Sequence, residues 1–309
     1  MNHLDKDLPP PADPRWRRIT VRELLQHRGG FDRGRSGDPM FRSVAVAREF
    51  GSEPPAGTGL IIRSMLGRPL DLDPGERDAY SNFGYCVLGR AIENASGEPY
   101  EKAVRRLVLG PLGIGDRAMR LGRTLPEHRA PGEVTYYTPN DAAGRSVFAP
   151  EVGRRVPQPY GAWNIEAMDA HGGWLASAPA LVRFASAFDV RFHPNLFNKR
   201  SLAAMFERPP GRAGQREDGR PRDAYYACGW QVRPVGRRGR NTWHTGSLPG
   251  TSTILVRRWD GLSWAVLFNT RDDPGGQFLA GKIDPLVHQA ADAVKEWPDR
   301  DLFPGPKSP

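Results

Sequence analysis

Two short segments contain residue types from which an acyl-transfer site can be built. Tyr80-Ser81-Asn82 and His244-Thr245-Gly246 combine a phenol, an amide, an imidazole and hydroxyls. Transfer of an acyl group from an ester or an amide needs a nucleophile, a base that takes its proton, and hydrogen-bond donors for the oxyanion. Taken alone, Tyr80 is more simply a half-buried structural tyrosine and His244 a hydrogen-bonded strand histidine. Only their combination with other parts of the chain favours chemistry.

Five segments occur in a fixed order along the chain. They are residues 19–27 with Gly29-Gly30, then Pro74-Gly75-Glu76, residues 80–85, Pro111-Leu112-Gly113, and His244-Thr245-Gly246. In this order and spacing they resemble the β-lactamase-related serine hydrolases, which include class C β-lactamases, D,D-peptidases, D-aminopeptidases and esterases. The resemblance extends from about Leu4 onward. It implies an α/β (α+β) fold of the β-lactamase type, in which an antiparallel sheet flanked by helices lies beside a mostly helical lobe.

The resemblance also implies roles for the first segment. Tyr80 would share the handling of the nucleophile's proton with the lysine of a Ser-x-x-Lys motif, and a nearby cation would favour its phenolate. Asn82 would hydrogen-bond the substrate amide and that lysine. Ser81 would face elsewhere and shape the loop.

The second segment would lie on a strand beside the substrate. Thr245 would orient the acyl side chain or a carboxylate, and Gly246 would leave room for close backbone approach. The backbone N–H of Ser247 would supply an oxyanion donor. His244 replaces the lysine of many β-lactamases, which favours a peptidase or esterase. The predicted catalytic residues are therefore Tyr80, Asn82 and Ser247, and the predicted substrate-binding residues are His244, Thr245 and Gly246.

The nucleophile itself is absent from this sequence. No lysine has a serine three residues before it, and no Gly-x-Ser-x-Gly segment is present. In the resembled family the Ser-x-x-Lys helix precedes the segment like residues 19–30, and residues 4–9 resemble the turn that follows that helix. We therefore expect a chain that starts just after the nucleophile helix and lacks the first strands of the sheet, through a late start codon, a broken gene or a true loss. Loss of the nucleophile helix would expose an apolar patch, so we expect the chain alone to be poorly soluble or inactive.

Local patterns predict the elements that position these segments. Residues 1–18 are rich in proline and indicate a connector, and Thr20 with Glu23 forms a capping box for a helix that ends near His27. Further helices are expected from Phe83 to Gly97, from Pro99 to Gly110, after an N-cap at Ser177, and over about 278–297. The apolar face of the helix after Phe83 is predicted to contain Val87, Leu88, Ala91, Ile92 and Ala95. Strands are predicted at 225–232, 241–245, 252–257 and 264–269.

Other side chains have two interpretations. For His27 and His171 we favour structural roles, although the resembled family places such loops near the site. Gly172-Gly173 with Ser177 matches the far wall of the family's pocket, but a turn and an N-cap also explain them. Three tryptophans either line a pocket or pack in the core: Trp163, Trp174 and Trp243.

Composition excludes several classes of protein. The chain has 309 residues, 39% of them hydrophobic, and a formal charge of +9. Its basic loops, 208–222 and 237–240, lack the aromatic interleaving of a nucleic-acid groove, so no nucleic-acid partner is expected. Cys86 and Cys228 indicate buried free thiols, and the spacing of the histidines predicts no metal site or cofactor. Neither a membrane span nor a signal peptide is recognisable, which leaves the cellular location open.

These observations predict one domain over 1–309, incomplete at its N-terminus. It would comprise a connector at 1–18, a helical lobe at about 60–200, and a sheet with a terminal helix at about 224–300. The expected function is a serine hydrolase acting on a small-molecule or peptide ester or amide, with no prediction of oligomeric state. The alternatives are a noncatalytic binding or scaffold protein that keeps the cleft, and an anion-binding surface protein that uses its arginine-rich loops.

Overall fold

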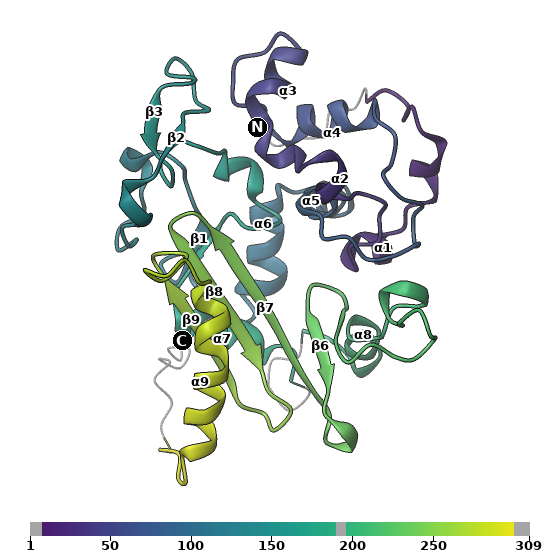
Figure 1. The fold of residues 1–309 in the computed structure, drawn as a ribbon, viewed down its shortest axis with the longest axis vertical. Helices are drawn as coiled ribbons and strands as arrows, with labels where there is room; N and C mark the ends of the chain where they lie inside the picture. Colours follow the sequence, from purple (N-terminus) through teal and green to yellow (C-terminus); the bar gives the residue numbers. More distant parts are fainter. Residues whose placement is uncertain (1–7, 190–195, 300–309) are drawn as a thin grey trace.

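A computed structural model describes residues 8–189 and 196–299 of the chain. It has a lobe of helices and loops above a five-stranded sheet (Figure 1). The predicted α/β fold class is confirmed. Residues 4–7, part of the segment likened to the family's turn, lie outside the described residues.

The sheet is antiparallel throughout, with the strand order β5-β6-β7-β8-β9. Side chains alternate strictly along the inner strand β8, where Ser252, Ile254 and Val256 are buried and their neighbours are partly exposed, as expected for period-two geometry. The strands are β5 (Tyr225–Tyr226), β6 (Gln231–Pro234), β7 (Arg240–Leu248), β8 (Thr251–Arg257) and β9 (Ser263–Phe268).

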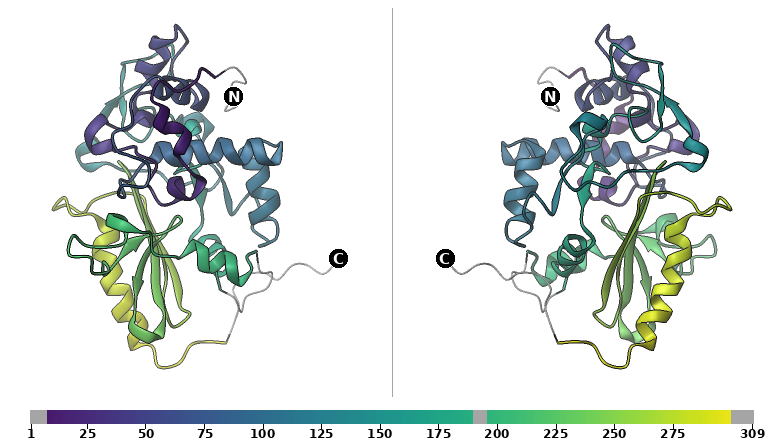
Figure 2. Two further views of the ribbon diagram at one scale, coloured as in Figure 1. Left: turned by 90° about the vertical axis from the view of Figure 1, so that its right-hand side faces the viewer. Right: turned by 90° about the vertical axis from the view of Figure 1, so that its left-hand side faces the viewer.

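Helices cover both faces of this sheet. The terminal helix α9 (Leu279–Ala293) packs on one face around Ile254, Val256 and Ala280. Helix α7 (Ala178–Ser186) contacts β8 and β9 on the other, so that Figure 2 shows the sheet between the two helices. One short helix and two strand pairs complete this half and its loops: α8 (Lys199–Met205), β1 (Met119–Leu121) with β4 (Trp174–Ala176), and β2 (Ala143–Arg145) with β3 (Arg155–Pro157).

The helical lobe is built around α5 (Asn82–Ser96), whose Phe83 and Cys86 are fully buried. Its core also takes side chains from helices that precede residue 60, so the lobe starts earlier than the predicted boundary of about 60, and α7 packs on the sheet rather than within the lobe. The remaining helices are α1 (Val21–Leu25), α2 (Arg33–Ser36), α3 (Ser43–Glu49), α4 (Thr58–Leu66) and α6 (Tyr100–Val104), which continues as a π-helical turn, Arg105–Leu109.

Two predicted helix starts, at Thr20 and Ser177, are confirmed. The capping box of α1 is complete, with Thr20 and Glu23 each accepting from the other's backbone N–H. Ser177 caps α7 through the N–H of Ala180. Side-chain capping involves residues only three positions apart, so sequence alone can specify it.

The predicted apolar face of α5 is confirmed for Val87 and Leu88, which belong to or pack against the core, and is wrong for the other three residues. Ala91, Ile92 and Ala95 are exposed, whereas the buried face includes Gly89 and Arg90. The helix is turned this way because Arg90 pairs with a distant carboxylate and because Gly89 faces Ala170, whose Cβ would lie 2.5 Å from an added Cβ. The spacing of apolar residues does not predict this buried face, because the face includes the charged residue Arg90.

Two predicted element boundaries are also wrong. The strand predicted at 225–232 is interrupted by a turn in which Gly229 has φ +77 and Ala227 donates to Trp230. The terminal helix ends at Ala293, because Val294 has extended backbone.

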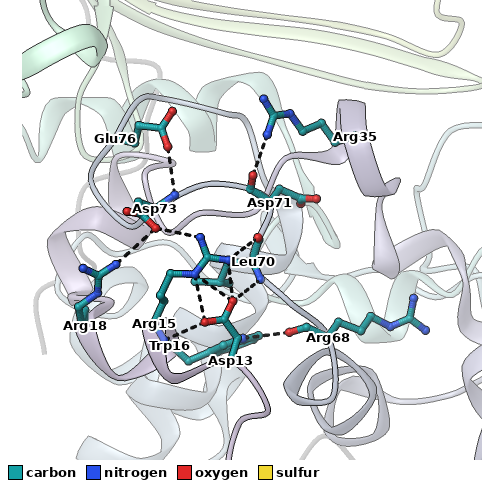
Figure 3. A network of polar contacts seen from close by, with 10 residues as sticks. All are labelled: Asp13, Arg15, Trp16, Arg18, Arg35, Arg68, Leu70, Asp71, Asp73 and Glu76. Carbon is teal, nitrogen blue, oxygen red and sulfur yellow. Dashed lines mark hydrogen bonds and ion pairs between the residues drawn. The ribbon is translucent and has the colours of Figure 1, made fainter.

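The segment before α1 is anchored, which corrects the prediction of a connector over its described part. Residues 14–18 form a 3-10 helix capped by Asp13, and Trp16 packs against Phe31 at a centroid distance of 5.1 Å. Arg15 joins Asp13, Asp73 and the carbonyl of Leu70 at 2.6, 2.8 and 2.7 Å (Figure 3). The prolines that exclude α-helix are compatible with this short tethered turn.

No helix within 8–189 and 196–299 has the length and apolar character needed to cross a bilayer.

Candidate functional site

The first predicted segment forms the N-terminus of α5. Ser81 is its N-cap, and the Ser81 hydroxyl accepts from the Gly84 N–H at 3.0 Å. Tyr80 therefore precedes the helix and Asn82 begins it. The Ser81 side chain faces the helix end.

The second predicted segment lies on β7 beyond the point where its pairing with β6 ends. Pairing with β6 runs from Pro234↔Arg240 to Gln231↔Trp243, whereas pairing with β8 continues to Leu248↔Thr251. Residues 244–248 consequently have a ladder partner on one side only. A strand with one open edge can accept another extended backbone.

A cavity of about 270 Å³ joins the two segments. The rings of Tyr80 and His244 are 6.4 Å apart within it, so the helical lobe and the sheet both contribute. It is lined by His27, Tyr80, Asn82, Tyr85, Ala170, His171, Gly172, Trp174, Tyr226, Gly229 and His244.

Three of the six predicted site residues, Tyr80, Asn82 and His244, line this cavity. Thr245, Gly246 and Ser247 follow on β7 without lining it, and Thr245 and Ser247 are exposed. Their assignment to a substrate edge stays a prediction.

His244 is held as a neutral imidazole. Its Nδ1 lies 2.8 Å from the Thr245 carbonyl oxygen, which can only accept, so Nδ1 carries the proton. Its Nε2 then accepts from the Tyr226 hydroxyl at 3.0 Å. Burial lowers the pKa of His244, which keeps the ring uncharged near neutral pH.

His27 lies among the phenol rings of Tyr80, Tyr85 and Tyr226. Its centroid is 4.2 Å from that of Tyr80 and 4.4 Å from that of Tyr226, and its Nδ1 accepts from the Ser81 N–H at 3.2 Å. Nε2 is buried without a hydrogen-bond partner among the described residues. Burial, with smaller contributions from His244 and Arg33, lowers the His27 pKa to about 3.

His171 is the second buried imidazole of the lining. Both of its ring nitrogens lack a hydrogen-bond partner in the described part of the chain, and burial lowers its pKa to about 4. Two residues of the lining, His27 and His171, therefore contain buried ring nitrogens without a hydrogen-bond partner among the described residues.

Tyr80 has the expected cation nearby but not the expected pKa. The Arg33 guanidinium carbon lies 4.6 Å from the Tyr80 ring centroid. Burial nevertheless raises the pKa of Tyr80, with Arg33 opposing this effect and Asp38 adding to it. The phenol is protonated at neutral pH, because desolvation outweighs one exposed cation. Asn82 is engaged as well, since its Nδ2 donates to Asp38 at 2.7 Å.

The wall opposite β7 is fixed by a buried ion pair. Arg90 of α5 is fully buried and contacts Asp169 at 2.6 Å and Glu93 at 3.2 Å. Asp169 immediately precedes Ala170, His171 and Gly172 of the lining, and its carbonyl accepts from the Trp174 indole at 2.8 Å. The charge pair thus positions one side of the cavity.

The lining has no side chain that could act as the missing nucleophile. It contains no serine, threonine, cysteine or lysine, and the hydroxyl of the neighbouring Ser81 is committed to the helix cap. Within the residues that the structure describes, no cluster of three metal-ligating side chains was found.

Comparison with known proteins identifies the family of this chain. A family model described as Beta-lactamase matches residues 3–286. The chain belongs to the β-lactamase family. A probable fimbrial assembly protein FimD of Dichelobacter nodosus is 40% identical over 95 residues, which is 31% of this chain and 22% of that protein. Penicillin-binding protein 4* of Bacillus subtilis is 23% identical over 266 residues, 82% of this chain and 52% of that protein. The chain therefore matches about half or less of the length of these curated relatives.

Solved structures share the fold. The D-amino acid amidase of Ochrobactrum anthropi superposes with a TM-score of 0.62 at 21% identity, over 93% of this chain and 76% of that one. The octameric penicillin-binding protein homologue of Pyrococcus abyssi gives 0.60 at 20% identity, over 89% and 56%. The β-lactamase-like architecture predicted from the motif order is thereby confirmed.

Sequence reasoning missed several members of this β-lactamase-family cavity. His27 and His171 were assigned structural roles, yet both line it, and of the three tryptophans only Trp174 does. The signal that could have found both histidines was the match of residues 19–30 and 172–173 to family segments near the site, because His27 lies within the first and His171 directly precedes the second. No spacing pattern pointed to Tyr226, whose hydroxyl reaches His244 of β7 from β5, the strand on the other side of β6.

We expect Gly246→Ala to destabilise the β-lactamase-family sheet by about 1–3 kcal/mol. An added Cβ would lie 2.5 Å from Thr253 Oγ1 on β8, so crowding within the sheet, independent of any substrate, requires glycine here. Urea unfolding of Gly246→Ala and of Gly246→Ala/Thr253→Ala would test this, because removing Oγ1 should restore much of the loss. Equal instability of the two variants would contradict it.

Proposed function

We propose that this chain forms the substrate-binding part of a serine hydrolase site that acts on esters or amides through an acyl-enzyme. The observation that carries the proposal is that Tyr80, Asn82 and His244, from two lobes, line one cavity beside the open edge of β7. In this proposal Tyr80 relays a proton and Asn82 binds the substrate amide. The Ser247 N–H donates to the oxyanion, while Thr245 and Gly246 border the substrate.

The 309-residue chain would bind such compounds without forming an acyl-enzyme. This part of the proposal is supported by the sequence, which has no Ser-x-x-Lys, and by a lining without a nucleophilic side chain. We expect no change in intact mass after incubation with a fluorescent penicillin or a fluorophosphonate. A stoichiometric adduct on any serine would contradict this expectation.

Reversible binding can be tested with a cavity-blocking variant. N-acetyl-D-alaninamide is a small amide probe, and its binding can be followed by ligand-observed NMR. Gly172 lines the cavity and an added Cβ there meets no atom within 4 Å, so Gly172→Leu should fill the cavity without disturbing the fold. Gly115→Leu is a matched control, since Gly115 is equally open and outside the lining. Binding that survives Gly172→Leu, or no binding at all, would overturn the proposed site.

The second candidate is a noncatalytic binding protein that keeps the cavity, favoured by the same absence of Ser-x-x-Lys. Labelling of the gene product isolated from its own cells separates the two. Covalent labelling by a penicillin or fluorophosphonate would support the hydrolase, whereas an unlabelled product of intact mass would support the binding protein.

A further inference from the structure

Two arginine side chains lie together on the face of the sheet opposite α9. Arg240 begins β7 and Arg257 ends β8. Thr242 is the register partner of Arg257 and lies two residues after Arg240, so the three side chains share this face. The guanidinium carbons of Arg240 and Arg257 lie 4.4 and 5.7 Å from the centroid of one ring, that of Phe206. The two cations are therefore neighbours.

Neither of these guanidiniums has an acceptor. Within residues 8–189 and 196–299, neither donates a hydrogen bond or forms an ion pair, and both only stack on phenylalanine rings. The Asp189 carboxylate acts on Arg257 from beyond ion-pair distance. The buried Thr242 hydroxyl bonds neither of them. The N–H groups of both arginines are therefore available to a ligand.

The pair is unfavourable in the free protein. Burial lowers the pKa of Arg257 to about 10, where the charge of Asp189 opposes and that of Arg240 adds to the effect. Burial also lowers the pKa of Arg240. Both side chains are still cations at neutral pH, so like charges are held partly desolvated without an acceptor. A bound anion would relieve both the repulsion and the desolvation.

A third arginine on this side of the sheet differs in this respect. Arg208 stacks on Tyr225 at 4.1 Å, but it also donates to the carbonyl oxygens of Gly214 and Arg222 at 2.9 and 2.8 Å. Its role in holding a loop accounts for its position. Stacking on a ring contributes about 0.5–1 kcal/mol at an exposed site, which does not explain why two unpaired cations share Phe206.

The arginine pair is separate from the cavity. Strand β7 begins at the end of the sheet that points away from the helical lobe (Figure 1). His244 follows Arg240 by four residues, which corresponds to about 13 Å along a strand. Neither Arg240 nor Arg257 belongs to the cavity lining.

We propose that Arg240 and Arg257 form a binding site for a phosphate group. Two planar guanidinium forks match the paired oxygens of a tetrahedral dianion and balance its charge. Phe206 would support both forks from below. The ligand is inorganic phosphate or a phosphate monoester, which present the same group. The inference does not depend on the proposed hydrolase function.

Calorimetric titration of the full chain with inorganic phosphate tests the site at about pH 8, where phosphate is doubly charged, with sodium chloride keeping the ionic strength equal. Arg240→Gln and Arg257→Gln should each raise the dissociation constant roughly tenfold, as for loss of charge-assisted hydrogen bonds. Arg233→Gln is a matched control, because Arg233 stacks on Trp243 at 5.2 Å on the opposite face of the sheet. It should change the constant by less than about twofold.

Two further variants exclude misfolding and binding in the cavity. Arg240 is exposed, so Arg240→Lys should keep the urea midpoint of the unaltered chain. Its phosphate affinity should fall between those of the unaltered chain and Arg240→Gln, because lysine keeps the charge and loses the fork. Gly172→Leu, which fills the cavity, should leave phosphate binding unchanged.

Each outcome decides the inference. Absence of phosphate binding, equally tight binding of acetate, an equal loss in Arg233→Gln, or blockage by Gly172→Leu would overturn it. Glycerol 3-phosphate identifies the source of the group: tighter binding than inorganic phosphate indicates a monoester, weaker binding indicates the free ion, and either supports the site. Failure of phosphate binding leaves the proposed function intact, because that function is tested with the amide probe.

Discussion

Arg90→Met is expected to lower the free energy of unfolding by about 3–5 kcal/mol, the usual cost of removing one partner from a buried ion pair. The Arg90 side chain is completely buried, and that of Asp169 is 4% exposed. Losing the guanidinium would leave two carboxylates, of Asp169 and Glu93, and would free the Thr58 hydroxyl that it contacts at 3.1 Å. Urea unfolding followed by circular dichroism measures the loss.

Two further variants make this prediction sharp. Arg90→Met/Asp169→Leu should recover part of the stability, because the most deeply buried carboxylate is then absent and Glu93 still accepts from the Tyr100 N–H. Arg68→Ala breaks a pair with Glu49 at 3.4 Å whose side chains are 38% and 42% exposed, and should cost at most about 1 kcal/mol. A loss below that in Arg90→Met, or a double variant as unstable as the single one, would contradict a stabilising role for the buried pair.

The cavity wall should respond together with stability. Because Asp169 precedes the Ala170-His171-Gly172 lining and receives the Trp174 indole through its carbonyl, Arg90→Met should also weaken binding of the amide probe. The double variant should restore it less completely than it restores stability, since apolar packing does not reproduce the directional contacts that Arg90 makes with α4 and α5.

Stability should fall as the pH drops from about 6.5 toward 4. An unfolded histidine has a pKa near 6.5, whereas the folded values are about 3 for His27 and about 4 for His171 because both rings are buried. Well above pH 6.5 neither state binds protons at these sites, so they add no pH dependence there. Below it the unfolded chain takes up protons that the folded chain does not, and the unfolded state is favoured.

Together the two sites should lower the free energy of unfolding by up to roughly 3 kcal/mol per pH unit within this window. Urea unfolding between pH 7 and 5 measures the slope before most unfolded carboxylates titrate. His171→Phe should reduce the slope by up to half, because His244, whose pKa burial also lowers, contributes in the same direction, whereas His128→Gln, at an exposed position, should leave it unchanged. A flat profile over this range would mean that His27 and His171 are accessible to protons in the folded protein.

The sequence by itself determined the features that depend on neighbours along the chain and on motif order. The Thr20 and Glu23 box, the Ser177 cap and the alternating strand β8 all arise from interactions within a few residues or from a simple period. The order of the five motifs along the chain was enough to identify the family and to predict Tyr80, Asn82 and His244 as site residues.

Only the tertiary structure decided what surrounds those residues. The Ser81 N–H meets His27 across 54 positions of the chain, and Arg90 meets Asp169 across 79. The position of Arg33 over Tyr80 likewise depends on how α2 packs beside α5. Such contacts leave no periodic trace, because a side chain buried for its charge or its polar atoms follows its distant partner and not the apolar pattern of its own helix. The buried face of α5 and the set of residues that lines the cavity are therefore properties of the packed molecule.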